Sequence, residues 1–146
     1  MIPSAIPKRS EWSFEIPSTL EAIDQVCAQF QKWRAIHCAG VSAFSSELLL
    51  REALINSVVH GATEGGDAKD AHKRIHGIVR SAFRAGRGLL TMTIHDEGDG
   101  FDWRAVWNRH AGPEDTGGRG IEILRRYASA VRFNPKGNTV TLLQRF

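Results

Sequence analysis

The sequence predicts an α/β fold, a two-layer α/β sandwich in which helices cover one face of a mixed, mainly antiparallel sheet. Strand-like segments occur in pairs joined by short turns, which favours antiparallel pairing. Two helical segments separate the first strand from these pairs, and a further helix lies between the pairs. The 146 residues, 42% of them hydrophobic, are enough for one core, so we expect a single domain over residues 1–146.

The chain begins with a predicted strand and an amphipathic helix. Apolar and polar residues alternate over residues 12–16, up to Pro17, as in a strand with one buried face. Residues 18–21 have the pattern of a capping box, in which the Ser18 hydroxyl caps the helix start. Apolar residues then recur every three or four positions, and Gly40 is expected to end the helix in a left-handed conformation.

A second helix is predicted from Ser45 or Ser46 to His60, with Gly61 after it. It is apolar on most sides, so we expect it to be buried. A polar surface loop follows over residues 62–74. The remaining predicted elements are a hairpin of strands 75–83 and 89–96, a short helix 103–109, a helix 121–127, and a final hairpin of strands 130–133 and 139–146.

The composition argues against two classes of partner. No apolar run is long enough for a membrane span, and the first residues lack the apolar core of a signal peptide, so we expect a cytoplasmic protein without membrane contact. The net charge of +3 comes from Lys and Arg residues scattered along the sequence, so no direct nucleic-acid binding is expected. Cys27 and Cys38 form no C-x-x-C pair and are interpreted as small apolar residues.

Three polar residues stand out in the second helix. Glu52, Asn56 and His60 are spaced by four, so their side chains lie one above another on one face. The rest of the helix is apolar, and a carboxylate is costly to bury unless a partner compensates it. The stripe therefore indicates a functional face. The alternative is the half-exposed rim of a structural helix, together with Glu47 and Arg51.

Asp96 ends the predicted strand 89–96 and continues its apolar series, so its carboxylate is expected to point toward the core side. There it can accept a hydrogen bond from a ligand amino group, and an Asx turn is the alternative. Gly98 and Gly100 follow, and glycines allow a ligand to approach the backbone closely. A calcium loop is not expected, because these glycines occupy positions that would need oxygen ligands.

A second glycine-rich turn, Gly117-Gly-Arg-Gly120, precedes the predicted helix 121–127. Free amides and the positive end of the helix dipole make such a helix start a natural phosphate site, to which Arg119 can add charge. The turn is not a P-loop, because no Gly-Lys-Ser/Thr follows. It is not a dinucleotide fingerprint either, because Ile123 stands where the third glycine would be.

Taken in this order, three segments resemble the asparagine box and the two glycine boxes of the GHKL ATPases: Glu52-Ala-Leu-Ile-Asn-Ser-Val-Val-His-Gly61, Asp96-Glu-Gly-Asp-Gly-Phe-Asp102 and Gly117-Gly-Arg-Gly-Ile121. Within that superfamily the chain resembles the free-standing anti-sigma-factor serine kinases, also called switch-protein kinases, over nearly its whole length. The resemblance implies the histidine-kinase-like ATPase fold (the Bergerat fold), ATP or ADP as ligand, and Mg²⁺ as the metal.

The resemblance also implies a role for each part of the site. Asn56 would bind Mg²⁺, Glu52 would act as general base, and Asp96 would bind the adenine amino group. A lid would cover about residues 103–117, and either Asn138 or Thr139 would lie close to the adenine. The remaining nucleotide contacts would come from His60, Gly98, Gly100, Gly117, Gly118, Arg119 and Gly120.

For function, the resemblance implies a homodimeric anti-sigma factor that phosphorylates serine in a STAS-domain antagonist and sequesters a sigma factor. The alternative is a nucleotide-dependent regulatory binding module without kinase activity. The ATP-binding half of a histidine kinase is not favoured, because we expect no room for a dimerisation helix with a phospho-accepting histidine. His72 and His76 are four residues apart but straddle a predicted loop and strand, so a metal site there is not favoured either.

Overall fold

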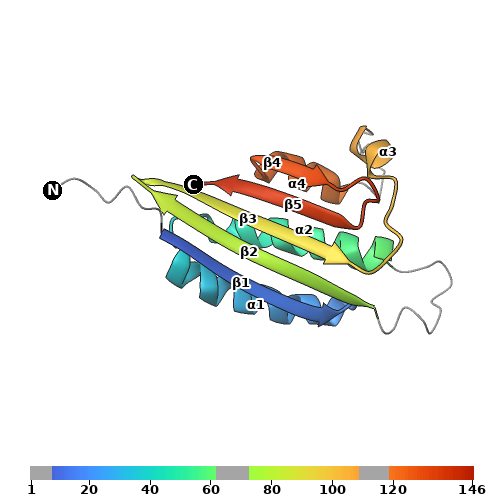
Figure 1. The fold of residues 1–146 in the computed structure, drawn as a ribbon, viewed down its shortest axis with the longest axis horizontal. Coiled ribbons are helices and arrows are strands. Elements are labelled where there is room, and N and C mark those ends of the chain that lie inside the picture. Colours follow the sequence, from blue (N-terminus) through green and yellow to red (C-terminus); the bar gives the residue numbers. More distant parts are fainter. Residues whose placement is uncertain (1–7, 62–72, 109–118) are drawn as a thin grey trace.

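The computed structural model describes residues 8–61, 73–108 and 119–146. They form a five-stranded antiparallel sheet in the order β1-β2-β3-β5-β4, with the helices on one face (Figure 1). This confirms the predicted two-layer sandwich, with antiparallel pairing throughout the described strands. The elements are β1 (Lys8–Pro17), α1 (Leu20–His37), α2 (Ala43–Gly61), β2 (Arg74–Arg84), β3 (Arg87–Asp96), α3 (Trp103–Asn108), α4 (Arg119–Tyr127), β4 (Ala130–Phe133) and β5 (Thr139–Arg145).

Strands β2 and β3 form the long hairpin at the centre of the sheet. Arg84 pairs with Arg87, so two residues make the turn. These residues, Ala85 and Gly86, have φ of 51° and 79°, and positive φ at both central positions is typical of a type I′ turn, whose twist matches that of the strands. The predicted hairpin is confirmed, with a tighter turn than expected.

Helix α1 does not begin with the predicted capping box. Its N-cap is Thr19, whose Oγ1 accepts a hydrogen bond from the Ala22 amide at 3.4 Å. The Ser18 amide donates to the backbone carbonyl of Lys73 at 3.1 Å, so Ser18 belongs to the entry of the chain into the helix. The assignment of the cap to Ser18 was therefore wrong by one residue.

The end of α1 also differs from the prediction. Cys38 is the C-cap and donates its amide to the carbonyl of Arg34 at 2.8 Å, while Gly40 does not adopt the left-handed conformation. Cys27 and Cys38 are both buried free thiols, and burial raises the pKa of each to about 11. Their interpretation as small apolar residues is confirmed.

Helix α2 lies between α1 and α4 and contacts β3 and β5. It begins at Ala43, earlier than predicted, because Ser42 Oγ accepts a hydrogen bond from the Ser45 amide at 3.2 Å. The predicted burial of α2 is confirmed by its fully covered apolar residues, which are Leu49, Leu50, Ala53 and Leu54. None of the helices within the described ranges combines the length and the apolar character of a membrane span.

The loop after β3 packs tightly on the turn between β4 and β5. A Cβ atom at Gly100 would collide with the carbonyl oxygen of Lys136, and one at Gly137 would collide with that of Phe101. The Asp96 amide also donates to the carbonyl of Asn138 at 2.9 Å. This contact between two backbone segments holds the end of β3 in place.

Gly86 and Gly100 have nearly the same positive φ, but only Gly100 lies against another backbone segment. Substituting each by alanine therefore separates the cost of a left-handed backbone from the cost of the steric contact. Gly86 has φ of 79° and no atom within 4 Å of an added Cβ, whereas Gly100 has φ of 83° and meets a backbone carbonyl. We expect Gly86→Ala to lower the free energy of unfolding by about 1 kcal/mol and Gly100→Ala by a further 1–3 kcal/mol or so, measured by urea denaturation. Equal losses for the two variants would contradict the close approach.

Candidate functional site

The polar face of α2 lies against the beginning of α4. A Cβ atom added to Gly120 would lie 2.8 Å from Glu52 Oε2 and 3.5 Å from Asn56 Oδ1. His60, half-buried, lies one turn further along the same helix. The stripe on α2 and the last glycine of the second turn are far apart in the sequence, and the fold brings them together.

Asp96 joins this region from the end of β3. The residue is only 6% exposed, and its Oδ1 accepts a hydrogen bond from the Gly98 amide at 2.9 Å. Asp96 and Asn56 line one narrow pocket, together with Phe101 and Asn138. The predicted orientation of Asp96 is confirmed, and the Asx turn considered as its alternative is present as well.

Burial sets the charge state of both carboxyl groups of the site. It raises the pKa of Asp96, against an opposing effect of the Gly98 amide and of nearby cationic groups. It also raises the pKa of Glu52, which the Arg51 guanidinium opposes. The ionised form of each carboxyl is therefore disfavoured in the protein alone and would be favoured by a bound hydrogen-bond donor or cation.

Asn56 has an unsatisfied amide. Its Nδ2 is buried and has no hydrogen-bond partner among the described residues, which costs on the order of 1–3 kcal/mol. Its Oδ1 lies beside Glu52 Oε2 at the Gly120 position. A donor that lacks an acceptor, next to two hard oxygen atoms, fits a phosphate-bearing ligand with Mg²⁺, which Asn56 would hold.

Asn138 contacts Asp96 directly, and Thr139 also lines the pocket. The Asn138 Nδ2 donates to the carbonyl oxygen of Asp96 at 3.3 Å, and its Oδ1 accepts from Asn134 Nδ2 at 2.6 Å. The Thr139 hydroxyl is hydrogen-bonded to His95 Nδ1 at 2.8 Å. Asn134 and its hydrogen bonds were not predicted, although an asparagine before Pro-Lys-Gly is ordinary turn chemistry and could have indicated them.

The ring of His60 stacks on Phe101, with centroids 4.1 Å apart and an angle of 8° between the planes. Burial lowers the pKa of His60, so the imidazole is neutral at neutral pH. The contact fixes Phe101, which follows Gly100 in the loop after β3. His60 therefore positions this loop, and its own contact with a nucleotide stays a prediction.

Aromatic residues hold helix α3, the beginning of the predicted lid. Trp103 Nε1 donates to the carbonyl of Asn134 at 3.0 Å, and its ring is stacked on Phe133 with centroids 5.2 Å apart. Trp107 contacts the same Phe133 edge-on at 6.3 Å. The first turns of this segment are thus anchored on β4.

Several predicted residues are not placed by the structure. Gly117 and Gly118 lie outside the described residues, as do His72 and the part of the predicted lid beyond residue 108, and the Arg119 side chain is likewise not described. His76 lies on the sheet, where it pairs with His95. Within the described parts of the chain, no group of three His, Cys, Asp or Glu side chains could hold a metal ion on its own.

The sheet with helices on one face, and a pocket between a polar helix stripe, a buried aspartate and a glycine loop, define a nucleotide-binding domain of the GHKL ATPase type. Residues 16–143 match the family model described as a histidine kinase-like ATPase domain. The chain belongs to this family, which supports ATP or ADP as its nucleotide. A search of curated proteins finds no match.

The buried charge of Asp96 predicts opposite effects of one substitution on stability and on binding. Its folded pKa is raised, so ionisation costs stability, and this cost grows as the pH rises from the unfolded value through the folded value. At neutral pH the nucleotide-free Asp96→Asn variant should be at least as stable as the parent, while calorimetry should show Mg-ATP affinity lowered at least about tenfold. Unchanged affinity would show that Asp96 does not contact the nucleotide.

Gly120 offers a second test, on stability alone. Alanine is favoured over glycine in a helix by up to about 1 kcal/mol, but its Cβ at this position would press on Glu52 Oε2. We expect Gly120→Ala to be neutral or destabilising in the parent and stabilising in a Glu52→Ala background, as measured in a double-mutant cycle by urea denaturation. Additive effects would mean that the two residues are not in contact.

Proposed function

We propose that this domain is a homodimeric anti-sigma factor and protein serine kinase, which phosphorylates a STAS-domain antagonist and sequesters a sigma factor. One observation carries the proposal. Glu52 is a half-buried carboxylate one turn from Asn56 and beside the beginning of α4, where the phosphates of ATP are expected. A carboxylate there is suited to accept a proton from an incoming hydroxyl, and the E-A-x-x-N-x-x-x-H-G motif supports this branch of the family.

In the proposed reaction, Glu52 accepts the proton of a serine hydroxyl of the partner. The serine oxygen forms a bond to the γ-phosphorus while the bond from that phosphorus to the ADP oxygen breaks, so ADP is the leaving group. Asp96 holds the adenine amino group, and the unsatisfied Asn56 amide binds a phosphate oxygen. Mg²⁺, held with Asn56, would neutralise charge on the phosphates.

The alternative is a regulatory binding module that binds ATP or ADP without phosphoryl transfer. The predicted lid, residues 103–117, contains no lysine. Two described arginines are already stacked on aromatic rings. Arg104, within the predicted lid, lies 4.5 Å from the centre of the Trp103 ring, and Arg125, on α4, lies 4.4 Å from the centre of the Trp107 ring. If Arg119 does not stabilise the charge that develops at the γ-phosphate, binding would be favoured over transfer, because transfer needs that charge to be stabilised.

Glu52→Gln separates the two functions, because glutamine keeps the shape of the side chain but cannot accept the proton. With labelled ATP and a purified STAS-domain protein, we expect transfer of label to fall about 10²- to 10⁴-fold, with Mg-ATP affinity nearly unchanged. The matched control is Glu47→Gln, a carboxylate on the same helix that lies 3.7 Å from Arg51, and it should leave transfer unaltered. Nucleotide binding without transfer by the parent protein would establish the module instead.

A further inference from the structure

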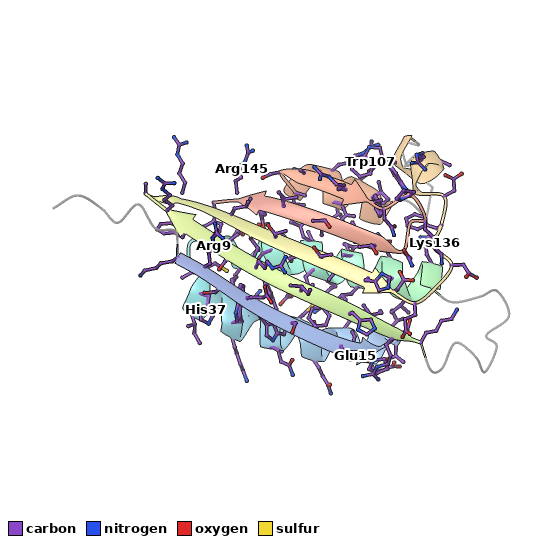
Figure 2. All side chains as sticks on the ribbon, in the orientation of Figure 1. Arg9, Glu15, His37, Trp107, Lys136 and Arg145 are labelled. Atoms are coloured by element: carbon purple, nitrogen blue, oxygen red, sulfur yellow. The ribbon has the colours of Figure 1, made fainter. Side chains whose placement is uncertain are left out.

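No described helix or strand covers the face of the sheet opposite the helices, and one end of this face is strongly basic. All described helices lie on the other side (Figure 1). Every second strand residue points to the open face, and the strand register aligns these residues in rows. One row crosses four strands as Arg9, Ala82, Leu89 and Arg145. The row lies toward the end of the sheet that carries the β2–β3 turn, and Figure 2 shows Arg9 and Arg145 there.

Five arginines gather at this end, although they are scattered along the sequence. We call them the arginine cluster: Arg9, Arg80, Arg84, Arg87 and Arg145. Arg80 is bound to Glu11, with Nε 2.7 Å from Oε2, and the other four make no ion pair with another described residue. Five arginines and one glutamate give a local charge of +4, more than the +3 of the whole chain.

The cluster surrounds a hollow with an apolar floor. Two adjoining cavities, of about 420 and 800 Å³, share Ala82 and Leu89 as common lining residues. The first extends to Arg9 and Arg80, and the second to Arg145 and the turn. Volumes of this size hold an extended side chain or a small ligand, and guanidinium groups on both sides favour a bound anion.

We propose that the arginine cluster is a docking surface for an acidic segment of a partner protein. Carboxylates of the segment pair with Arg9, Arg145 and the arginines of the turn, and an apolar side chain between them enters the hollow over Ala82 and Leu89. Arginine forms paired hydrogen bonds with carboxylates, so the geometry of the four unpaired guanidinium groups suits such a segment.

Two other occupants fit this surface less well. A single-stranded nucleic acid needs aromatic rings on which bases stack, but the two rings that line the second cavity, Phe83 and Phe146, are stacked on each other with centroids 6.3 Å apart. A second copy of the chain, packed about a twofold axis through the cluster, would bring arginines against arginines. Charge therefore favours a different, acidic protein.

The docking surface and the nucleotide site lie at opposite ends of β3. Leu89 and Asp96 are seven residues apart on this strand, which corresponds to about 24 Å. A segment bound at the arginine cluster would leave the nucleotide pocket accessible. The proposal therefore does not depend on phosphoryl transfer.

The test uses a fluorescent extended peptide in which glutamate and leucine alternate at every second position, with serine between them, so that both can face the surface. A matched peptide has glutamine in place of glutamate. Fluorescence anisotropy with the full chain should show binding of the acidic peptide only, weakened by salt. The double variant Arg9→Glu/Arg145→Glu should lower the affinity about tenfold or more. Arg132→Glu, an exposed arginine of the same face on β4, should have no effect beyond about twofold.

Thermal unfolding and Mg-ATP affinity of the double variant should match those of the parent, which shows that the fold and the nucleotide site are intact. Equal binding of both peptides, or an unchanged affinity of the double variant, would overturn the proposal. Tighter binding of a single-stranded oligonucleotide than of the acidic peptide would overturn it in favour of a nucleic-acid surface. A dimer that the double variant abolishes would assign the face to self-association.

Discussion

The structure depends on a single constraint, the position of α2. This helix is packed against α1 on one side and α4 on the other, and it covers β3 and β5. Most of its apolar residues are buried or partly buried in these contacts, and the polar residues Glu52, Asn56 and His60 share one of its faces. Because α4 begins against Glu52 and Asn56, this side of the helix is only partly exposed to water. A polar surface enclosed in this way is a site for a ligand.

The same enclosure makes the site electrostatically unfavourable when the protein is alone. Two carboxyl groups have raised pKa values and one amide nitrogen lacks an acceptor, so the stability of the domain is lower than its packing would allow. In the proposed site, the adenine amino group would offer a donor to Asp96, a phosphate oxygen would offer an acceptor to the Asn56 amide, and Mg²⁺ would bring a positive charge near Glu52. The free energy of binding would then include the recovery of these local costs, and the stabilisation of the domain by its ligand should rise with the logarithm of the ligand concentration.

Local patterns were sufficient for the fold class, because alternation and helical periodicity report directly which faces are buried. They also predicted the orientation of Asp96, which follows from its place in the alternation of β3. Local patterns failed where the conformation of a residue depends on a contact with a segment that is distant in the sequence. Ser18 and Thr19 are both residue types that cap helices, and the backbone contact of Ser18 with Lys73, which favours Thr19 as the cap, cannot be seen in the local pattern. Likewise the close approach of Gly100 to the Lys136 carbonyl was not predicted, while its contact with a ligand stays a prediction.

The burial of the two cysteines has a practical consequence. Their pKa of about 11 keeps both thiols protonated near neutral pH, and the protonated thiol is a poor nucleophile. Cys27 and Cys38 are also the only cysteines of the chain. A cysteine introduced at an exposed position such as Ser13 would therefore react selectively with a maleimide dye, so the native protein can carry a spectroscopic reporter without removal of its own thiols.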